Sequence, residues 1–390
     1  MKIGIDISQL AFPGTGVATY TQNLVENLLK IDKQSLLPRN KKNEYILFFS
    51  SLRQKVPKLQ ISKTQNNIKI KTFKLPSLIL EFLWNRLHLV PVEKFAGQLD
   101  VFHTSDWLEP PAKCPKVTTI HDLAIFKYPE TFTPRGGHDI VVNLKRKLEW
   151  VKKESRLIIA VSESTKRDVI EILGIPEERI RVVHEACNPE FTEKSKEDTE
   201  RIKKKYRIKG DYILAVGTLE PRKNLKRVIE AFEKLQKTQK LKLVVAGKFG
   251  WGEGIEKLKI KNKQSLSLRD EKLKILGLVS QEDLPSLYSG AQVFVYPSLY
   301  EGFGLPILEA MASGCPVVTS NVSSMPEVAG EAAVLVNPED VENIARGIEE
   351  AIKKRDDLIK KGYEQVKKFS WEKTARETLK VYEEAYVNRG

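Results

Sequence analysis

Short hydrophobic runs alternate along the chain with longer segments in which hydrophobic residues recur every three or four positions. The short runs predict strands and the longer segments amphipathic helices, so the chain is expected to be α/β with parallel sheets. Seven predicted strands lie in the first half: Ile3–Ile7, Tyr45–Phe49, Ile68–Phe73, Val101–His103, Val117–His121, Leu157–Val161 and Ile180–Val183. Six lie in the second half: Tyr212–Val216, Lys242–Ala246, Lys274–Leu276, Val293–Tyr296, Val317–Thr319 and Ala333–Val336.

A charge-rich stretch without a strand pattern, residues 192–201, separates the two series. The 390 residues suffice for two domains with separate cores. We therefore predict two Rossmann-like domains, residues 1–190 and 191–370. Ligands of such sheets bind beyond the carboxyl ends of the strands. Two domains that face each other would place these strand-end loops across one cleft.

Residues 297–314 are the most informative segment. Pro306 suits the first position of a helix and Gly314 the residue just past its end. Residues 302–305 would then offer backbone N–H groups at the positive end of a helix, where an anion binds. Glu301 and Glu309, on either side, are poor anion ligands but good partners for sugar hydroxyls. The segment predicts a nucleotide-sugar site.

Residues 217–224, Gly-Thr-Leu-Glu-Pro-Arg-Lys-Asn, follow a predicted strand and precede a helix with apolar residues on one face. Asn224 is a candidate N-cap. Arg222 and Lys223 would lie where the helix dipole is already positive, and a diphosphate supplies the compensating charge. The alternative interpretation is a pair of solvated loop charges.

The first half offers weaker candidates. Gly14 and Gly16 follow the first strand like a phosphate-binding turn, but a tight turn explains them equally well. His121 ends a predicted strand, as do His103 and Asp106 at another strand, and each histidine could instead be structural.

The net charge of +14 invites an anionic partner. Both halves of the chain share the excess and no nucleic-acid-binding motif occurs, so we do not expect a nucleic-acid partner. Residues 144–156 combine Lys145, Arg146, Lys147 and further cations with Leu148 and Trp150. This pattern predicts a basic amphipathic helix that could lie on anionic lipid, or an ordinary solvated helix packed on a core.

The three cysteines have no metal-ligand spacing, and the histidines match no metal site, so no metal is expected. The N-terminus begins with a strand pattern rather than a signal peptide, and no apolar run reaches the ~20 residues of a membrane span. We expect a cytoplasmic protein, and a peripheral position at the inner face of the cell membrane stays open.

Thr218-Leu-Glu-Pro-Arg-Lys-Asn224 and Pro297-Ser-Leu-Tyr-Glu-Gly-Phe-Gly-Leu-Pro-Ile-Leu-Glu309 resemble signatures of the retaining glycosyltransferases with the GT-B fold, group 1 of family 4. The second contains that family's pair of glutamates separated by seven residues. Thr119-Ile-His-Asp122, Val161-Ser-Glu-Ser164 and Ser370-Trp371 extend the resemblance over nearly the whole chain. Bacterial polysaccharide mannosyltransferases are the subgroup it resembles most.

The resemblance implies a role for each matched position. Arg222 and Lys223 would bind the diphosphate, and Glu301 and His121 would contact the donor sugar. The remaining donor-binding positions that it implies are Gly14, Gly16, Leu278, Val279, Phe303, Gly304, Leu305 and Glu309. Helix 371–390 would cross back to the first domain.

The implied activity is retaining, metal-independent transfer of a hexose, with mannose from GDP-mannose favoured. The acceptor would be a saccharide or a lipid-linked saccharide in polysaccharide assembly. Front-face attack is the expected mechanism, and double displacement through Glu301 or Asp122 stays open. The alternatives are another GT-B activity on a soluble acceptor, a phosphorylase, a nucleotide-sugar epimerase, a non-catalytic nucleotide-sugar-binding protein and a basic nucleic-acid-binding protein.

Overall fold

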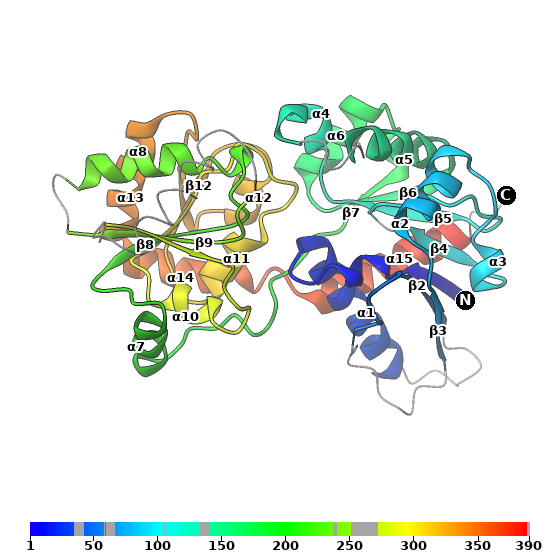
Figure 1. Cartoon of the computed structure of the whole chain (residues 1–390), viewed down its shortest axis with the longest axis horizontal. Helices are drawn as coiled ribbons and strands as arrows, with labels where there is room; N and C mark the ends of the chain where they lie inside the picture. Colours follow the sequence, from blue (N-terminus) through cyan, green and yellow to red (C-terminus); the bar gives the residue numbers. More distant parts are fainter. Residues whose placement is uncertain are drawn as a thin grey trace. The chain divides into compact units, whose positions relative to one another are not determined.

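The computed structural model describes residues 1–34, 43–57, 59, 67–104, 106–132, 140–236, 240–250 and 272–387. The chain forms two compact units, shown in Figure 1. The first unit comprises Met1–Glu185 and Trp371–Gly390, and the second comprises Ala186–Ser370. The division lies close to residue 190, and the prediction for residues 388–390 falls outside the described residues.

The first unit contains, among the described residues, a seven-stranded parallel sheet in the order β3-β2-β1-β4-β5-β6-β7. Its strands are β1 (Lys2–Asp6), β2 (Glu44–Ser50), β3 (Ile68–Phe73), β4 (Val101–Thr104), β5 (Lys116–Ile120), β6 (Ser155–Ala160) and β7 (Ile180–Val182). Its longer helices are α1 (Gly16–Gln34), α5 (Ile140–Glu154), α6 (Glu163–Leu173) and α15 (Trp371–Val387). Its short helical segments are η1 (Ser8–Ala11), α2 (Ser77–Leu80), η3 (Glu81–Arg86), α3 (Glu93–Ala96), α4 (Ala124–Lys127), η4 (Pro129–Thr131) and η5 (Glu177–Arg179).

The second unit contains, within the same described ranges, a six-stranded parallel sheet in the order β10-β9-β8-β11-β12-β13. Its strands are β8 (Tyr212–Val216), β9 (Lys242–Ala246), β10 (Leu273–Gly277), β11 (Val293–Tyr296), β12 (Val317–Ser320) and β13 (Ala333–Val336). Its helices are α7 (Lys196–Lys205), η6 (Pro221–Lys223), α8 (Leu225–Leu235), α10 (Leu284–Ser289), α11 (Leu305–Ala312), α12 (Met325–Ala329), α13 (Val341–Lys353) and α14 (Arg355–Val366).

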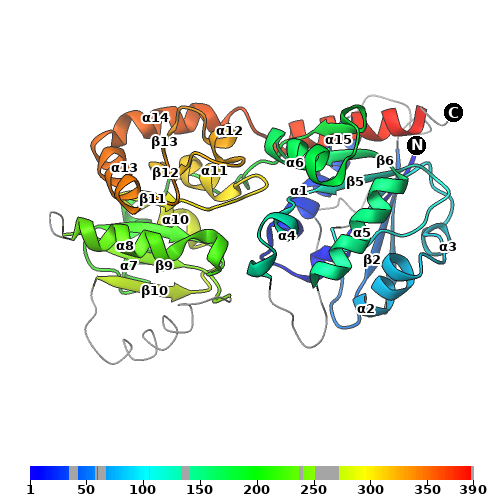
Figure 2. The ribbon, with the colours of Figure 1, turned by 90° about the horizontal axis from the view of Figure 1, so that it is seen from above.

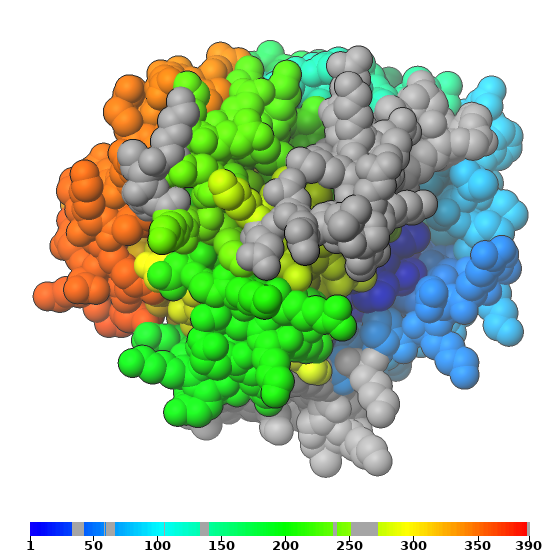
Figure 3. All heavy atoms as spheres, turned by 60° about the vertical axis from the view of Figure 1, so that its left-hand side comes forward, coloured from blue at the N-terminus to red at the C-terminus, as the bar shows by residue number. Residues whose placement is uncertain are grey.

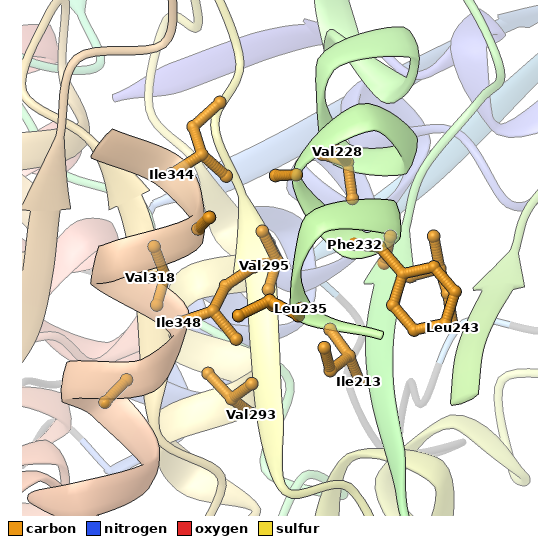
Figure 4. Packing of buried hydrophobic residues seen from close by; sticks show 14 of the residues in the cluster. Ile213, Val228, Phe232, Leu235, Leu243, Val293, Val295, Val318, Ile344 and Ile348 are labelled. Carbon is orange, nitrogen blue, oxygen red and sulfur yellow. The ribbon is translucent and has the colours of Figure 1, made fainter. Parts of the chain in front are cut away.

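Helices cover both faces of each sheet. In the first unit, α5 and α6 lie on one face, and α1 and α15 pack together on the other (Figure 2). In the second unit, α8 and α13 share one face, and their green and orange surfaces adjoin in Figure 3. Side chains from these two helices, including Phe232 and Ile348, interdigitate with Val293 and Val295 of the sheet (Figure 4). Inner strands such as β2 and β8 are buried on both faces, which explains why they are continuous hydrophobic runs rather than alternating ones. The edge strand β3 is mostly exposed, and its sequence alternates.

The prediction of strands is confirmed, because each predicted run lies on a strand of the two sheets. Helix α11 confirms the predicted helix but begins one residue earlier than predicted, so Pro306 is its second residue and Leu305 its first. Gly314 adopts a left-handed conformation, with φ of 70°, directly after the C-cap residue Ser313, which confirms its predicted place.

Helix α5 decides between the two interpretations of residues 144–156 in favour of a solvated helix packed on a core. The apolar residues Leu148 and Val151 are buried against the first unit's own core, so they are not available to lipid. Lys147, which the sequence placed in the basic cluster, is only 1% exposed. Lys145 and Arg146 are exposed. The amphipathic pattern was right, but its apolar side faces the protein.

Candidate functional site

The strand order of the second unit reverses between β8 and β11, because β9 and β10 continue to one side and β12 and β13 to the other. Ligands of doubly wound sheets bind at this reversal, beyond the carboxyl ends of the strands. Residues 217–224 follow β8 and residues 297–304 follow β11. The two motifs found in the sequence therefore lie side by side at the predicted ligand-binding edge.

Glu301 holds the two motifs together. Its Oε2 accepts a hydrogen bond of 2.9 Å from the Arg222 guanidinium, and its Oε1 accepts one of 2.6 Å from Lys223 Nζ. Arg222 also donates to Glu220 Oε1 at 2.7 Å and to the Tyr300 carbonyl at 2.6 Å. Lys223 donates to the Tyr296 hydroxyl at 2.8 Å. The two carboxylates and two cations together carry no net charge.

Burial alone would raise the pKa of Glu301, which is 8% exposed. The charges of Arg222 and Lys223 outweigh burial and lower this pKa to about 2. Glu301 is therefore ionised at neutral pH, and its carboxylate holds the side chains of Arg222 and Lys223 in place.

Serine hydroxyls from the connection between β12 and α12 bind the backbone of the loop after β11. Ser323 donates to the Glu301 carbonyl at 2.5 Å, and Ser324 lies within hydrogen-bond distance of the carbonyls of Glu301 and Phe303. Gly304 has a φ of 106°, which favours glycine, and begins α11. These contacts fix the loop ahead of the positive end of α11. The two serines carry no sequence signal of their own and were not predicted.

Asn224 occupies the predicted N-cap position of α8 but does not act as predicted. It has a φ of 60°, and its side chain makes no capping hydrogen bond. Its amide instead donates to the carbonyls of Pro297 at 3.0 Å and Pro338 at 2.6 Å. The left-handed backbone turns the side chain from its own helix toward the neighbouring loops. Asn224 therefore joins the loop after β8 to the loop after β11.

The strand-end turns after β8 and β9 are in direct backbone contact. A Cβ added at Gly247 would lie 1.8 Å from the Gly217 carbonyl oxygen, so only glycine fits. After β10, Leu278 is 80% exposed and Val279 is buried. The Leu278 side chain therefore lies in solvent. The predicted contacts of Leu278 and Val279 with the nucleotide base involve backbone atoms, so the exposure of this side chain does not test them.

Glu309, on α11, is held differently from Glu301. It is half-buried, and its Oε2 accepts a hydrogen bond of 3.2 Å from the Tyr288 hydroxyl. Burial raises the pKa of Glu309 to about 7, with the Tyr288 hydrogen bond opposing the shift. Within the part of the chain that the structure describes, no cation shifts this pKa, in contrast to that of Glu301.

In the first unit, the strand order reverses between β1 and β4. His121 follows β5, and its Nδ1 makes a hydrogen bond of 2.8 Å with Glu185 Oε1. The His121 ring packs edge-on against Tyr20, with centroids 4.7 Å apart. Burial by itself lowers the pKa of His121, but the hydrogen bond and charge of Glu185 outweigh it and raise this pKa. Glu185 was not predicted, because it lies 64 residues from His121.

Two further strand-end residues of the first unit, His103 and Asp122, form hydrogen bonds within the protein. His103 is 3% exposed, and its ring nitrogens bind the Tyr382 hydroxyl at 2.6 Å and Thr119 Oγ1 at 2.9 Å. Burial lowers the pKa of His103 to about 3, so it is neutral. Asp122 accepts the backbone N–H of Ala124 at 2.9 Å and so stabilises the start of α4.

A small polar cavity of about 10 Å³ lies at the same edge of the first sheet, with room for about one water-sized group. Its polar lining comes from the ends of three strands, from η1 and from α1. Gln9 Oε1 is buried there with no hydrogen-bond partner among the described residues. The polar residues that line it are Asp6, Gln9, Tyr20, Thr21, His103, Thr104, Asp106, Thr119 and His121.

Gly14 and Gly16 lie in an exposed turn at the start of α1. Gly14 has a φ of 81°, and a Cβ at either glycine would meet nothing within 4 Å. Thr15 Oγ1 accepts the backbone N–H of Ala18 at 3.2 Å and caps the helix. The turn therefore leaves open space beside both glycines, and their predicted role in donor binding stays a prediction.

Among the described residues, no group of three or more His, Cys, Asp or Glu side chains is arranged to hold a metal ion. No helix in the described part of the chain is long and apolar enough to cross a membrane.

Comparison with known proteins agrees with this geometry. The family described as glycosyl transferases group 1 matches residues 197–368, and glycosyltransferase family 4 matches residues 14–191. O-antigen chain mannosyltransferase B of Escherichia coli is 31% identical over 98% of this chain and 99% of its own length. The chain belongs to glycosyltransferase family 4. O-antigen chain mannosyltransferase RfbU of Salmonella typhimurium is 28% identical over 86% of this chain and 87% of its own.

The glycosyltransferase shares its fold with an Anabaena protein, HepE, solved in complex with UDP-glucose. The TM-score is 0.70 at 16% identity, over 98% of this chain and 100% of that one. The predicted GT-B fold, with two Rossmann-like domains, is thereby confirmed. The phosphorylase, epimerase and nucleic-acid-binding alternatives gain no support from these matches.

The pKa of Glu309 predicts how the stability of this glycosyltransferase depends on pH. An unfolded glutamate ionises near pH 4.5 and the folded Glu309 near pH 7, so its ionisation costs stability progressively between these values. At about pH 8 we expect Glu309→Gln to have a free energy of unfolding roughly 1 to 3 kcal/mol above that of the wild type, and therefore a higher unfolding temperature. At about pH 4 the two proteins should unfold alike. Thermal unfolding at both pH values measures this. Glu339→Gln, at an exposed position, is the control, and equal stabilisation at both pH values would contradict the shift.

The contact with Glu185 predicts the ionisation of His121. In Glu185→Gln the half-buried ring loses its carboxylate partner, so we expect the His121 pKa to fall. NMR titration of the histidine ring protons measures this value, with buried His103 as an internal reference. Glu177→Gln, at an exposed carboxylate that pairs with Lys166, is the control. An unchanged His121 titration in Glu185→Gln would show that Glu185 does not govern the ring.

Proposed function

We propose that this glycosyltransferase transfers mannose from GDP-mannose, with retention of configuration and without a metal ion. The acceptor that we propose is a saccharide or a lipid-linked saccharide in polysaccharide assembly. Two relatives that match most of this chain are named as O-antigen chain mannosyltransferases, which supports mannose as the sugar. The observation that carries the proposal is the contact of Arg222, Lys223 and Glu301 at the strand-order reversal.

The proposed chemistry follows from charge. The anomeric carbon becomes oxocarbenium-like as the sugar leaves its diphosphate. Arg222 and Lys223, fixed beside the N-terminus of α11, would stabilise the negative charge that develops on the leaving group. In this proposal these fixed charges take the place of a metal ion. Glu301 would accept hydrogen bonds from sugar hydroxyls, and Glu309 from the ribose.

Retention through front-face attack is the mechanism that we propose. A double displacement would need a carboxylate nucleophile that is available to the anomeric carbon. Glu301 is hydrogen-bonded to two cations, and Asp122 accepts the N–H of Ala124. Both candidate nucleophiles are thus engaged, which supports transfer of the acceptor's proton to the leaving phosphate oxygen. His121, with its raised pKa, would donate a hydrogen bond to the donor sugar.

We propose that the protein acts in the cytoplasm, where a nucleotide-sugar donor is available, and that it can associate peripherally with the membrane. The additional donor contacts that we propose are the backbone groups of Leu278, Val279, Phe303, Gly304 and Leu305, and the open turn at Gly14 and Gly16.

Donor identity is tested by thermal unfolding with GDP-mannose, UDP-glucose, ADP-glucose and dTDP-glucose. A bound donor stabilises the fold by mass action, so we expect GDP-mannose to raise the midpoint most. NMR of the transfer or slow hydrolysis product should show the α-anomer first, and chelator should not reduce turnover. A larger rise of the unfolding midpoint with another nucleotide sugar would make that compound the donor instead of GDP-mannose, and the proposed transferase activity would stand. If no donor shifts the midpoint or is turned over, the proposed function is wrong.

The diphosphate assignment is tested by substitution of its cations. We expect Arg222→Ala and Lys223→Ala each to lower kcat about 100-fold or more, because a fixed charge at the leaving group is lost. Lys226→Ala, an exposed cation on the next helix, should retain wild-type kcat. Circular dichroism and unfolding midpoints show whether the variants remain folded. Wild-type turnover in a folded Arg222→Ala or Lys223→Ala variant would contradict the role of that residue.

A further inference from the structure

The first unit exposes a cluster of large apolar side chains between β3 and β4. Leu78 and Ile79 lie on α2 and Phe82 on η3, with spacings of three and four residues that place them on one helical face. We call the cluster the apolar ridge. Its members are Leu78 (57% exposed), Ile79 (51%), Phe82 (50%), Leu87 (45%) and Leu89 (53%). A concentration of exposed apolar residues of this kind marks an interaction surface.

The exposure of the apolar ridge is fixed by a buried anchor beneath it. Trp84 is fully buried, and its indole N–H donates to the Val90 carbonyl at 3.0 Å. Asn85 donates to the Trp107 carbonyl at 2.8 Å. His88 has a φ of 53° and Val90 a φ of 62°, a conformation that disfavours a β-branched residue. The anchor holds the backbone in this strained form, so the exposed side chains belong to a rigid surface.

Helix α5 lies beside the ridge. The Trp150 ring stacks on His88 at 3.6 Å, and its N–H donates to the Asn85 carbonyl at 3.0 Å. Arg146 and Lys153 lie four residues before and three residues after Trp150, so they share its face of α5. Lys153 Nζ lies 4.9 Å from the centre of the Trp150 ring.

The exposed charge around the ridge is mainly positive. Arg86 lies over the Phe82 ring at 5.6 Å, and Lys74 precedes α2. Arg146 and Lys153 add two cations from α5. The acidic groups nearby are Glu81, which is half-buried, Glu154, which pairs with Lys116 and His88, and the exposed Glu149.

We propose that the apolar ridge and its cations dock the first unit on an anionic lipid bilayer. Leucine, isoleucine and phenylalanine enter the boundary between headgroups and acyl chains, while the lysines and arginines meet the anionic headgroups. A protein partner that covered this surface would need its own acidic rim. This inference names the surface for the membrane association of the proposed function, and it does not rest on the proposed donor, whose candidate residues lie mainly in the second unit.

The test is co-sedimentation of the full chain with vesicles of phosphatidylcholine alone, or of phosphatidylcholine with an equal part of phosphatidylglycerol. We expect binding to the anionic vesicles that weakens with added salt. The triple variant Leu78→Ser, Ile79→Ser, Phe82→Ser should reduce the bound fraction about tenfold. The pair Arg146→Gln, Lys153→Gln should weaken binding to anionic vesicles only.

Matched controls separate this surface from general effects. Leu52→Ser removes an apolar side chain of 55% exposure elsewhere in the same unit, and Lys204→Gln with Lys226→Gln removes two exposed cations of the second unit. Both controls should bind vesicles like the wild type. Donor turnover and unfolding midpoint should be unchanged in the triple variant, which shows that it is folded.

Three results would overturn the proposal. The first is a wild-type protein that stays in the supernatant with anionic vesicles. The second is a triple variant that binds these vesicles as well as the wild type. The third is light scattering that shows a dimer in the wild type and a monomer in the triple variant, without vesicle binding, and this result would assign the ridge to a second copy of the chain.

Discussion

Parallel strands place every loop that follows a strand on the same edge of its sheet, and both candidate half-sites depend on this constraint. In the second unit, the reversal between β8 and β11 brings residues 217–224 beside residues 297–304. In the first unit, β1, β4 and β5 lead to the small polar cavity and to His121. The glycines, serines and Asn224 that shape these loops act on an arrangement that the sheets already impose.

Glu220 and Glu301 together make the cationic site neutral before any ligand binds. Two lysine or arginine side chains at the positive end of a helix would repel each other and the helix dipole. The carboxylates of Glu220 and Glu301 remove this cost and hold both side chains in one geometry. Under the proposed function, the diphosphate enters a preorganised site.

The sequence predicted well what depends on local pattern. The strands, α11 and the two motif loops followed from hydrophobic runs and from Pro306 and Gly314. Contacts between residues that are far apart in the sequence could not be predicted, because no sequence spacing indicates which residues meet. Glu185 beside His121 and the serines that bind the loop of Glu301 are of this kind. The burial of Lys147 and the αL form of Asn224 depend on tertiary packing, which overrides the local preferences of charged and capping residues.

Helix α15 has a consequence for synthesis of the protein. Its Tyr382 hydroxyl binds buried His103, and the helix packs on α1 and on the strands of the first sheet. Residues 371–387 follow the second unit in the chain, so they leave the ribosome after it. Domains usually fold in the order of their synthesis. Here the first unit cannot complete its fold until its last helix has been synthesised, whereas the contiguous segment Ala186–Ser370 is by then available to fold. A nascent chain that stalls before residue 371 would expose the apolar underside of the first sheet to chaperones and proteases.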